Sequence, residues 1–127
     1  MGDLSSGFWI IDDDLSFGRA LKRMLNAKGF RAEYFGSAQS FLDSVPAGES
    51  GTAVVDIHMP DCNGFELMER MRALHYSMPV VIITGQPYPK TRELAVENGA
   101  AGYLQKPFSG ESLLELLRKR EQDKASL

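Results

Sequence analysis

The sequence predicts an α/β fold in which five strand–helix units form one doubly wound parallel sheet. Continuous apolar runs at residues 8–11, 53–55 and 80–83 have the composition of parallel strands that are covered on both faces. Stretches with apolar residues at helical spacing lie between these runs and after them. Because crossovers between parallel strands are right-handed, the helices are expected to cover both faces of the sheet.

Two further strands are predicted at the edges of the sheet. Residues 30–35 alternate between apolar and charged side chains, which is typical of a strand with one covered face. Residues 101–105 form a weaker apolar run, and we place this strand at the opposite edge. The three continuous apolar runs would then lie at the centre of the sheet.

Four of the five predicted helices carry a clear apolar stripe. In the fourth helix the apolar candidates are Leu94 and its two neighbours, so this helix is expected to be the most loosely held. Pro87 and Pro89 disfavour helical geometry in the residues before them, which predicts that this helix begins no earlier than about Pro89. Gly29 and Gly99 are expected to close the first and fourth helices. The other stripes comprise Phe17, Leu21, Met24 and Leu25; Ala38, Phe41, Leu42 and Val45; Leu67, Met68, Met71 and Leu74; and Leu113, Leu116 and Leu117.

Composition indicates one domain over residues 1–127, with a core at about 7–121. A chain of 127 residues that is 43% hydrophobic can bury one core and is too short for two. The sequence has no apolar run near the ~20 residues of a membrane span, no leader, and a single cysteine, Cys62, so a cytoplasmic protein is expected. A net charge of −3 without a broad basic face makes direct nucleic-acid binding unexpected.

Polar and charged residues follow four of the five predicted strands. Asp12 and Asp13 end the first strand, Asp56 ends the third, Thr84 ends the fourth, and Lys106 follows the fifth. In an open parallel sheet the carboxyl ends lie on one rim, and ligands bind where the strand order reverses. These five side chains are therefore expected to converge.

The chemistry of such a cluster indicates a metal-assisted phosphoryl site. Three crowded carboxylates repel one another and need a cation to remain ionised. Mg²⁺ is the expected ion, because it prefers oxygen ligands and keeps several waters. A lysine and a threonine hydroxyl add donors for an anion, and Asp56 is the expected nucleophile, forming an acyl phosphate.

Four segments of the sequence resemble the receiver (REC) domain of two-component response regulators. The resemblance covers essentially the whole chain, and the segments "IITG" at 82–85 and "GAAGYLQKPF" at 99–108 together are most similar to FixJ-like regulators. It implies a flavodoxin-like, three-layer (βα)5 sandwich with strand order 2-1-3-4-5. The segments are "IIDDD" at 10–14, "VVDIHMPDCNGFEL" at 54–67, "VVIITG" at 80–85 and "GAAGYLQKPF" at 99–108.

The resemblance also implies roles for individual residues. Asp56 would accept a phosphoryl group from a sensor histidine kinase or a phosphotransfer protein. Asp12, Asp13 and Asp56 would hold Mg²⁺ together with the backbone carbonyl of His58, and Lys106 would pair with the phosphoryl group. Such a domain is not an enzyme in the ordinary sense, but it assists its own phosphorylation and dephosphorylation.

A second implied group of residues transmits the signal. Thr84 and Tyr103 resemble the two switch residues that remodel the face formed by the fourth helix, fifth strand and fifth helix. That face would contact an output domain controlling transcription, a protein target, or a second copy in a phosphorylation-dependent homodimer. A stand-alone receiver that acts through protein contacts is the alternative. The resemblance also implies a cis Lys106–Pro107 bond.

Other interpretations of the same residues are less favoured. A haloacid-dehalogenase-type phosphatase needs a second acid two residues after the nucleophile, where this sequence has His58. A flavodoxin-like redox module needs a phosphate-binding loop after the first strand, where three acids stand. A degenerate receiver used for docking is at odds with the complete set of acids, threonine and lysine. Asp14 is expected to be a helix N-cap and not a third metal ligand.

Overall fold

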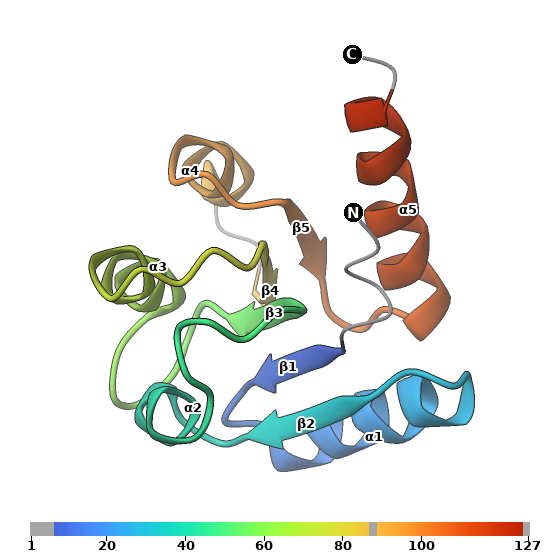
Figure 1. Ribbon diagram of the computed structural model, residues 1–127, viewed down its shortest axis with the longest axis horizontal. Helices are drawn as coiled ribbons and strands as arrows, with labels where there is room; N and C mark the ends of the chain where they lie inside the picture. Colours follow the sequence, from blue (N-terminus) through green and yellow to red (C-terminus); the bar gives the residue numbers. More distant parts are fainter. Residues whose placement is uncertain (1–6, 87–88, 126–127) are drawn as a thin grey trace.

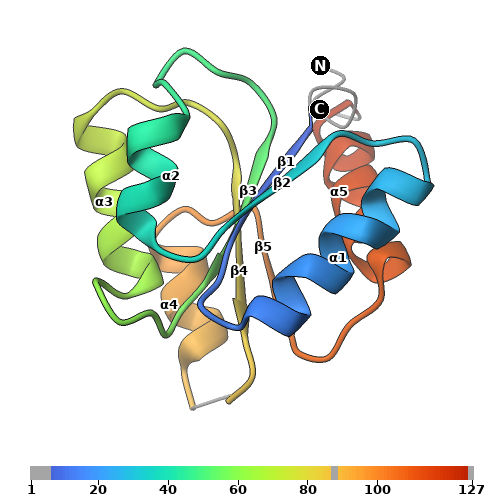
Figure 2. The same cartoon turned by 90° about the horizontal axis from the view of Figure 1, so that it is seen from below.

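The computed structural model describes residues 7–86 and 89–125, which form a five-stranded parallel sheet in the order β2-β1-β3-β4-β5. Figure 1 shows the sheet between two layers of helices, and Figure 2 shows that α1 and α5 cover one face while α2, α3 and α4 cover the other. The predicted three-layer fold and strand order are therefore confirmed. The strands are β1 (Phe8–Ile11), β2 (Ala32–Phe35), β3 (Thr52–Asp56), β4 (Val80–Thr84) and β5 (Gly102–Gln105), and the helices are α1 (Leu15–Ala27), α2 (Ala38–Ser44), α3 (Gly64–Ala73), α4 (Thr91–Glu97) and α5 (Gly110–Ala125).

The sheet separates two hydrophobic cores because successive strand residues point to opposite faces. In β1, Phe8 and Ile10 pack beneath α1 and α5, whereas Trp9 and Ile11 pack beneath the other three helices. Every residue of β1, β3 and β4 is buried, while most residues of the edge strands β2 and β5 are not. This difference explains why the central strands have continuous apolar sequences.

Local signals at the helix ends behave as the sequence predicts. The Asp14 carboxylate accepts a hydrogen bond from the backbone N–H of Phe17 at 3.1 Å, which confirms it as the N-cap of α1. Gly29 and Gly99 follow the last residues of α1 and α4 with φ of 94° and 84°, left-handed values that glycine adopts readily. The Lys106–Pro107 bond is cis, as expected.

Burial departs from the predicted apolar stripes at several positions. Leu74 is 51% exposed because α3 ends at Ala73 and the chain turns there. Met24 is 37% exposed, since it lies at the border of α1 and α5, where its sulfur accepts a hydrogen bond from the backbone N–H of Gly110 at 2.8 Å. In α5, Leu114 is buried although it was not predicted, and Leu116 is only partly buried.

Helix α4 buries little of its surface. It begins at Thr91, after Pro89 as predicted, and within it Thr91 and Ala95 are the buried residues. Val96 is 71% exposed, and Leu94 is also exposed. Pro87, on which part of the prediction for this helix rested, lies outside the described residues. Within the described part of the chain, no helix combines the length and apolar character needed to cross a membrane.

Candidate functional site

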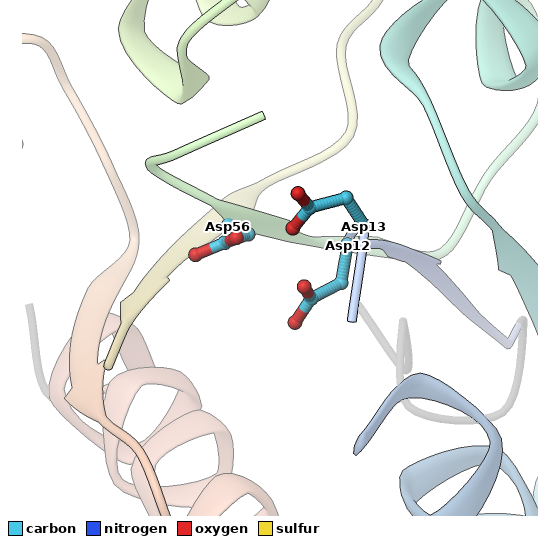
Figure 3. A group of neighbouring side chains, drawn as sticks. All are labelled: Asp12, Asp13 and Asp56. Carbon is cyan, nitrogen blue, oxygen red and sulfur yellow. The ribbon is translucent and has the colours of Figure 1, made fainter. Parts of the chain in front are cut away.

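Three carboxylates converge at the carboxyl ends of the two central strands β1 and β3. Figure 3 shows Asp12, Asp13 and Asp56 as neighbouring side chains, and one oxygen from each lies within 4.8 Å of the others. The register causes this arrangement, because Ile11 of β1 pairs with Val55 of β3 and the next residue on each strand is an aspartate. The predicted convergence of these three residues is present in the structure.

Lys106 joins this cluster from the loop after β5. Its ammonium nitrogen lies 2.6 Å from Asp12 Oδ2 and 3.9 Å from Asp56 Oδ1. The lysine side chain is only 14% exposed and those of the two aspartates are 0% and 6% exposed, so the ion pairs are largely shielded from water. Shielding strengthens each charge interaction compared with the same pair at the surface.

The pKa of Asp56 indicates that the site has too little positive charge to balance its carboxylates. Burial and the neighbouring charge of Asp12 raise the pKa of Asp56 to about 7, although the Lys106 ammonium and a backbone hydrogen bond from His58 act in the opposite direction. One lysine therefore does not compensate for the crowded carboxylates. A further cation would favour the ionised form of Asp56.

The donor set fits a hard divalent cation such as Mg²⁺. All three side chains offer carboxylate oxygens, which this ion prefers. Asp12 Oδ1 accepts the backbone N–H of Asp14 at 2.9 Å, but the buried Asp12 Oδ2 has no hydrogen bond despite its close ion pair with Lys106. Asp13 and Asp56 border an open cavity of about 380 Å³, large enough for an ion with several waters, lined by Asp13, Asp14, Asp56, His58, Gly85, Gln86 and Lys106.

Thr84 and Tyr103 come from β4 and β5. Thr84 is fully buried at the end of β4, where its hydroxyl donates to the carbonyl of Gln86 and accepts the Gln86 backbone N–H, both at 3.1 Å. Tyr103 is partly buried in β5, with the guanidinium of Arg92 lying 5.0 Å from the centre of its ring. Strand alternation places both side chains on the face covered by α4.

The loop that carries Asp12 is held by Tyr34 of β2, for which the sequence analysis proposed no role. The Tyr34 hydroxyl donates to the backbone carbonyl of Asp12 at 2.5 Å. Its ring lies so close to Gly18 of α1 that a Cβ added there would collide with Tyr34 Cε1. A glycine inside a helix is unfavourable, so Gly18 was a sequence signal of a close contact.

Comparison with known proteins identifies the family. The family model of the response regulator receiver domain matches residues 8–118. The transcriptional regulatory protein FixJ of Bradyrhizobium diazoefficiens is 35% identical over 109 residues, which are 86% of this chain and 53% of that protein. The chain thus spans about half the length of this relative.

Solved structures agree with this similarity. The crystal structure of FixJ-N superposes with a TM-score of 0.80 at 29% identity, covering 91% of this chain and 93% of that one. A crystal structure of a response regulator protein from Burkholderia pseudomallei, with a phosphorylated aspartic acid, calcium ion and citrate, gives a TM-score of 0.80 at 27% identity and covers 95% and 72% of the two chains.

Proposed function

The chain belongs to the response regulator receiver domains, and we propose that Asp56 is its phosphoacceptor, receiving a phosphoryl group from a sensor histidine kinase or a phosphotransfer protein. The observation that carries this proposal is the position of a buried Asp56 between two further acids and the Lys106 ammonium. A single nucleophilic carboxylate at the rim of a parallel sheet, flanked by charge-neutralising groups, suits phosphoryl transfer.

In the transfer step, an Asp56 carboxylate oxygen forms a bond to phosphorus while the bond from phosphorus to the donor breaks. The chain contributes mainly alignment and charge, since little covalent chemistry is left to it. The Asp12, Asp13 and Asp56 carboxylates and the His58 carbonyl would hold Mg²⁺, which when bound neutralises charge on the phosphoryl oxygens. Lys106 then leaves Asp12 and pairs with the phosphoryl group.

The switch begins with the Thr84 hydroxyl. In the unphosphorylated chain this hydroxyl is bonded to Gln86, at the start of the connection to α4. A phosphoryl group on Asp56 offers it a stronger, charged acceptor. Movement of Thr84 frees space for Tyr103 to change its rotamer and leave Arg92, which alters the surface of α4, β5 and α5.

The α4-β5-α5 face supports a partner-binding role. The exposed Leu94 and Val96 lie on α4, and a shallow cavity of about 210 Å³ opens between α4, β5 and α5 beside Val96, Tyr103 and Leu116. Because the FixJ relative is about twice as long as the matched segment, an attached output domain that controls transcription is favoured over a stand-alone receiver. We also propose that phosphorylation promotes a homodimer through the same face. The protein is proposed to act in the cytoplasm.

Intact-mass measurement after incubation with acetyl phosphate and Mg²⁺ tests the phosphoacceptor. The wild-type chain should gain one phosphoryl group, and Asp56→Asn should gain none, because the amide cannot attack phosphorus. Asp61→Asn is a matched control, since Asp61 lies in the loop that follows Asp56 but bonds to the backbone of α2. An unmodified wild type, labelled Asp56→Asn, or catalytic release of phosphate without an adduct would each contradict the proposal.

A further inference from the structure

The Lys106 ammonium has an aromatic neighbour in addition to its two carboxylates. Its nitrogen lies over the ring of Phe17, 4.7 Å from the ring centre. A cation over the face of an aromatic ring is attracted by the negative face of the ring, and the attraction grows when water is excluded. Since the lysine side chain is 14% exposed, this contact is largely desolvated.

The Phe17 ring is itself fixed from two sides. The backbone N–H of Phe17 donates to the Asp14 carboxylate, so Phe17 lies in the capped first turn of α1, directly after the acidic loop. Its ring meets Phe108 edge to face, with centres 5.2 Å apart and planes at 69°. Because Phe108 lies two residues after Lys106, Phe17 contacts both the lysine and the loop that carries it.

This arrangement bears on how Lys106 moves during transfer. The ammonium now lies closer to Asp12, at 2.6 Å, than to Asp56, at 3.9 Å. To pair with a phosphoryl group on Asp56 it must leave Asp12. A hydrogen bond would fix one donor direction, whereas a ring face attracts the ammonium over a range of positions. The ring can therefore retain the cation during this movement.

We infer that Phe17 is a positioning residue for phosphoryl transfer: its ring keeps the Lys106 ammonium within reach of the group that Asp56 receives. This inference rests on the proposed function. An aliphatic side chain at this position would fill similar space but would not attract the cation, so Lys106 would more often be directed to solvent once it leaves Asp12.

The first test compares Phe17→Leu with wild type in phosphorylation by acetyl phosphate, which passes its phosphoryl group to Asp56 and releases acetate. This small donor removes any effect on kinase docking. At saturating Mg²⁺ the transfer rate of Phe17→Leu should fall about five- to tenfold, equivalent to roughly 1–1.4 kcal/mol. Phe17→Tyr, which retains a ring face, should restore at least half of the wild-type rate.

Phe30→Leu is the matched control for loss of a ring. Phe30 is also partly buried in the core under α1 and α5 and also pairs edge to face, with Phe8 at 5.7 Å, but among the described residues no cation lies over its ring. This variant should lose stability to a similar extent yet transfer at the wild-type rate. An equal loss of rate in both variants would assign the effect of Phe17 to packing and overturn the inference.

A double-mutant cycle with Lys106→Met provides the decisive comparison. If the ring acts through the ammonium, Phe17→Leu should change the rate less than twofold once the ammonium is absent. A full five- to tenfold loss in that background would refute the positioning role. Wild type and Asp56→Asn are measured alongside: no labelling of wild type would reject the proposed function, whereas labelled wild type with an unimpaired Phe17→Leu would reject only the role of Phe17.

Discussion

Replacing Asp56, the proposed phosphoacceptor, should stabilise the metal-free protein. Asp56 is 4% exposed, and burial together with the charge of Asp12 raises its pKa from 3.8 to about 7. The folded state therefore binds this proton more tightly than the unfolded chain does. The favourable contribution of the protonated group is fully present below about pH 4 and is lost as pH rises to about 7.

The size of the effect follows from the pKa values. At about 1.4 kcal/mol per pKa unit, the change from 3.8 to about 7 corresponds to roughly 4 kcal/mol lost above neutral pH. Asp56→Asn removes the ionisation but leaves a buried amide that still needs hydrogen-bond partners. We therefore expect this variant to be about 2–4 kcal/mol more stable than wild type at pH 8 without metal, and close to wild type at pH 4.

Urea unfolding in EDTA at a series of pH values measures this difference. Fluorescence of Trp9, the single tryptophan of the chain, reports on the core beneath α2, α3 and α4. Subtracting the two unfolding free energies at each pH cancels the titration of all other groups that behave alike. Saturating Mg²⁺ should reduce the difference at pH 8. A difference that stays constant between pH 4 and 8 would refute the assigned electrostatics of Asp56.

Three further changes test the surroundings of the site. Gly18→Ala should cost about 1–3 kcal/mol of unfolding free energy in urea, because its Cβ would meet the Tyr34 ring, whereas Gly48→Ala, with open space around it, should be neutral. Asp13→Asn should weaken Mg²⁺ binding about tenfold or more by calorimetry, and unchanged affinity would contradict its role as a ligand. Burial disfavours ionisation of Asp61, but the backbone N–H groups of Gln39 and Ala38 outweigh it and lower the pKa of Asp61. Because Asp61 is exposed and solvent screens its charge, Asp61→Ala should cost at most about 1 kcal/mol at pH 7. The difference should disappear as pH falls below about 4, and a difference that persists at pH 2 would oppose this account.

Much of the fold could be predicted because each strand is defined by local composition. The central strands are covered on both faces, so their sequences are continuously apolar and their ends are marked by the first polar residue. That polar residue is also where parallel topology gathers ligands. Hence Asp12, Asp56 and Lys106 were expected to meet, and the structure brings them together.

The contacts that refine the site could not be predicted in the same way. Phe17 lies over Lys106, and Tyr34 reaches the carbonyl of Asp12. Each contact joins residues that are far apart in the sequence. An apolar stripe predicts that a residue is buried, but it does not predict which residue it will contact. Leu74 shows the complementary failure, because it matches the helical spacing of α3 but lies beyond the last helical residue. Spacing predicts a face only while the helix continues.

The balance of charge at the site bears on how phosphorylation could move α4. Three carboxylates share one ammonium, so bound Mg²⁺ brings the cluster close to neutrality, and a phosphoryl group then adds negative charge. In the proposed mechanism, Lys106 and the Thr84 hydroxyl are two donors that would offset that charge. The hydroxyl must first give up its two bonds to Gln86, each worth only about 1 kcal/mol net. The charged acceptor offers about 1.5–3 kcal/mol, so the two loop arrangements differ by little energy. Phosphorylation would therefore act on α4 as a shift between populated states and not as an all-or-none rearrangement.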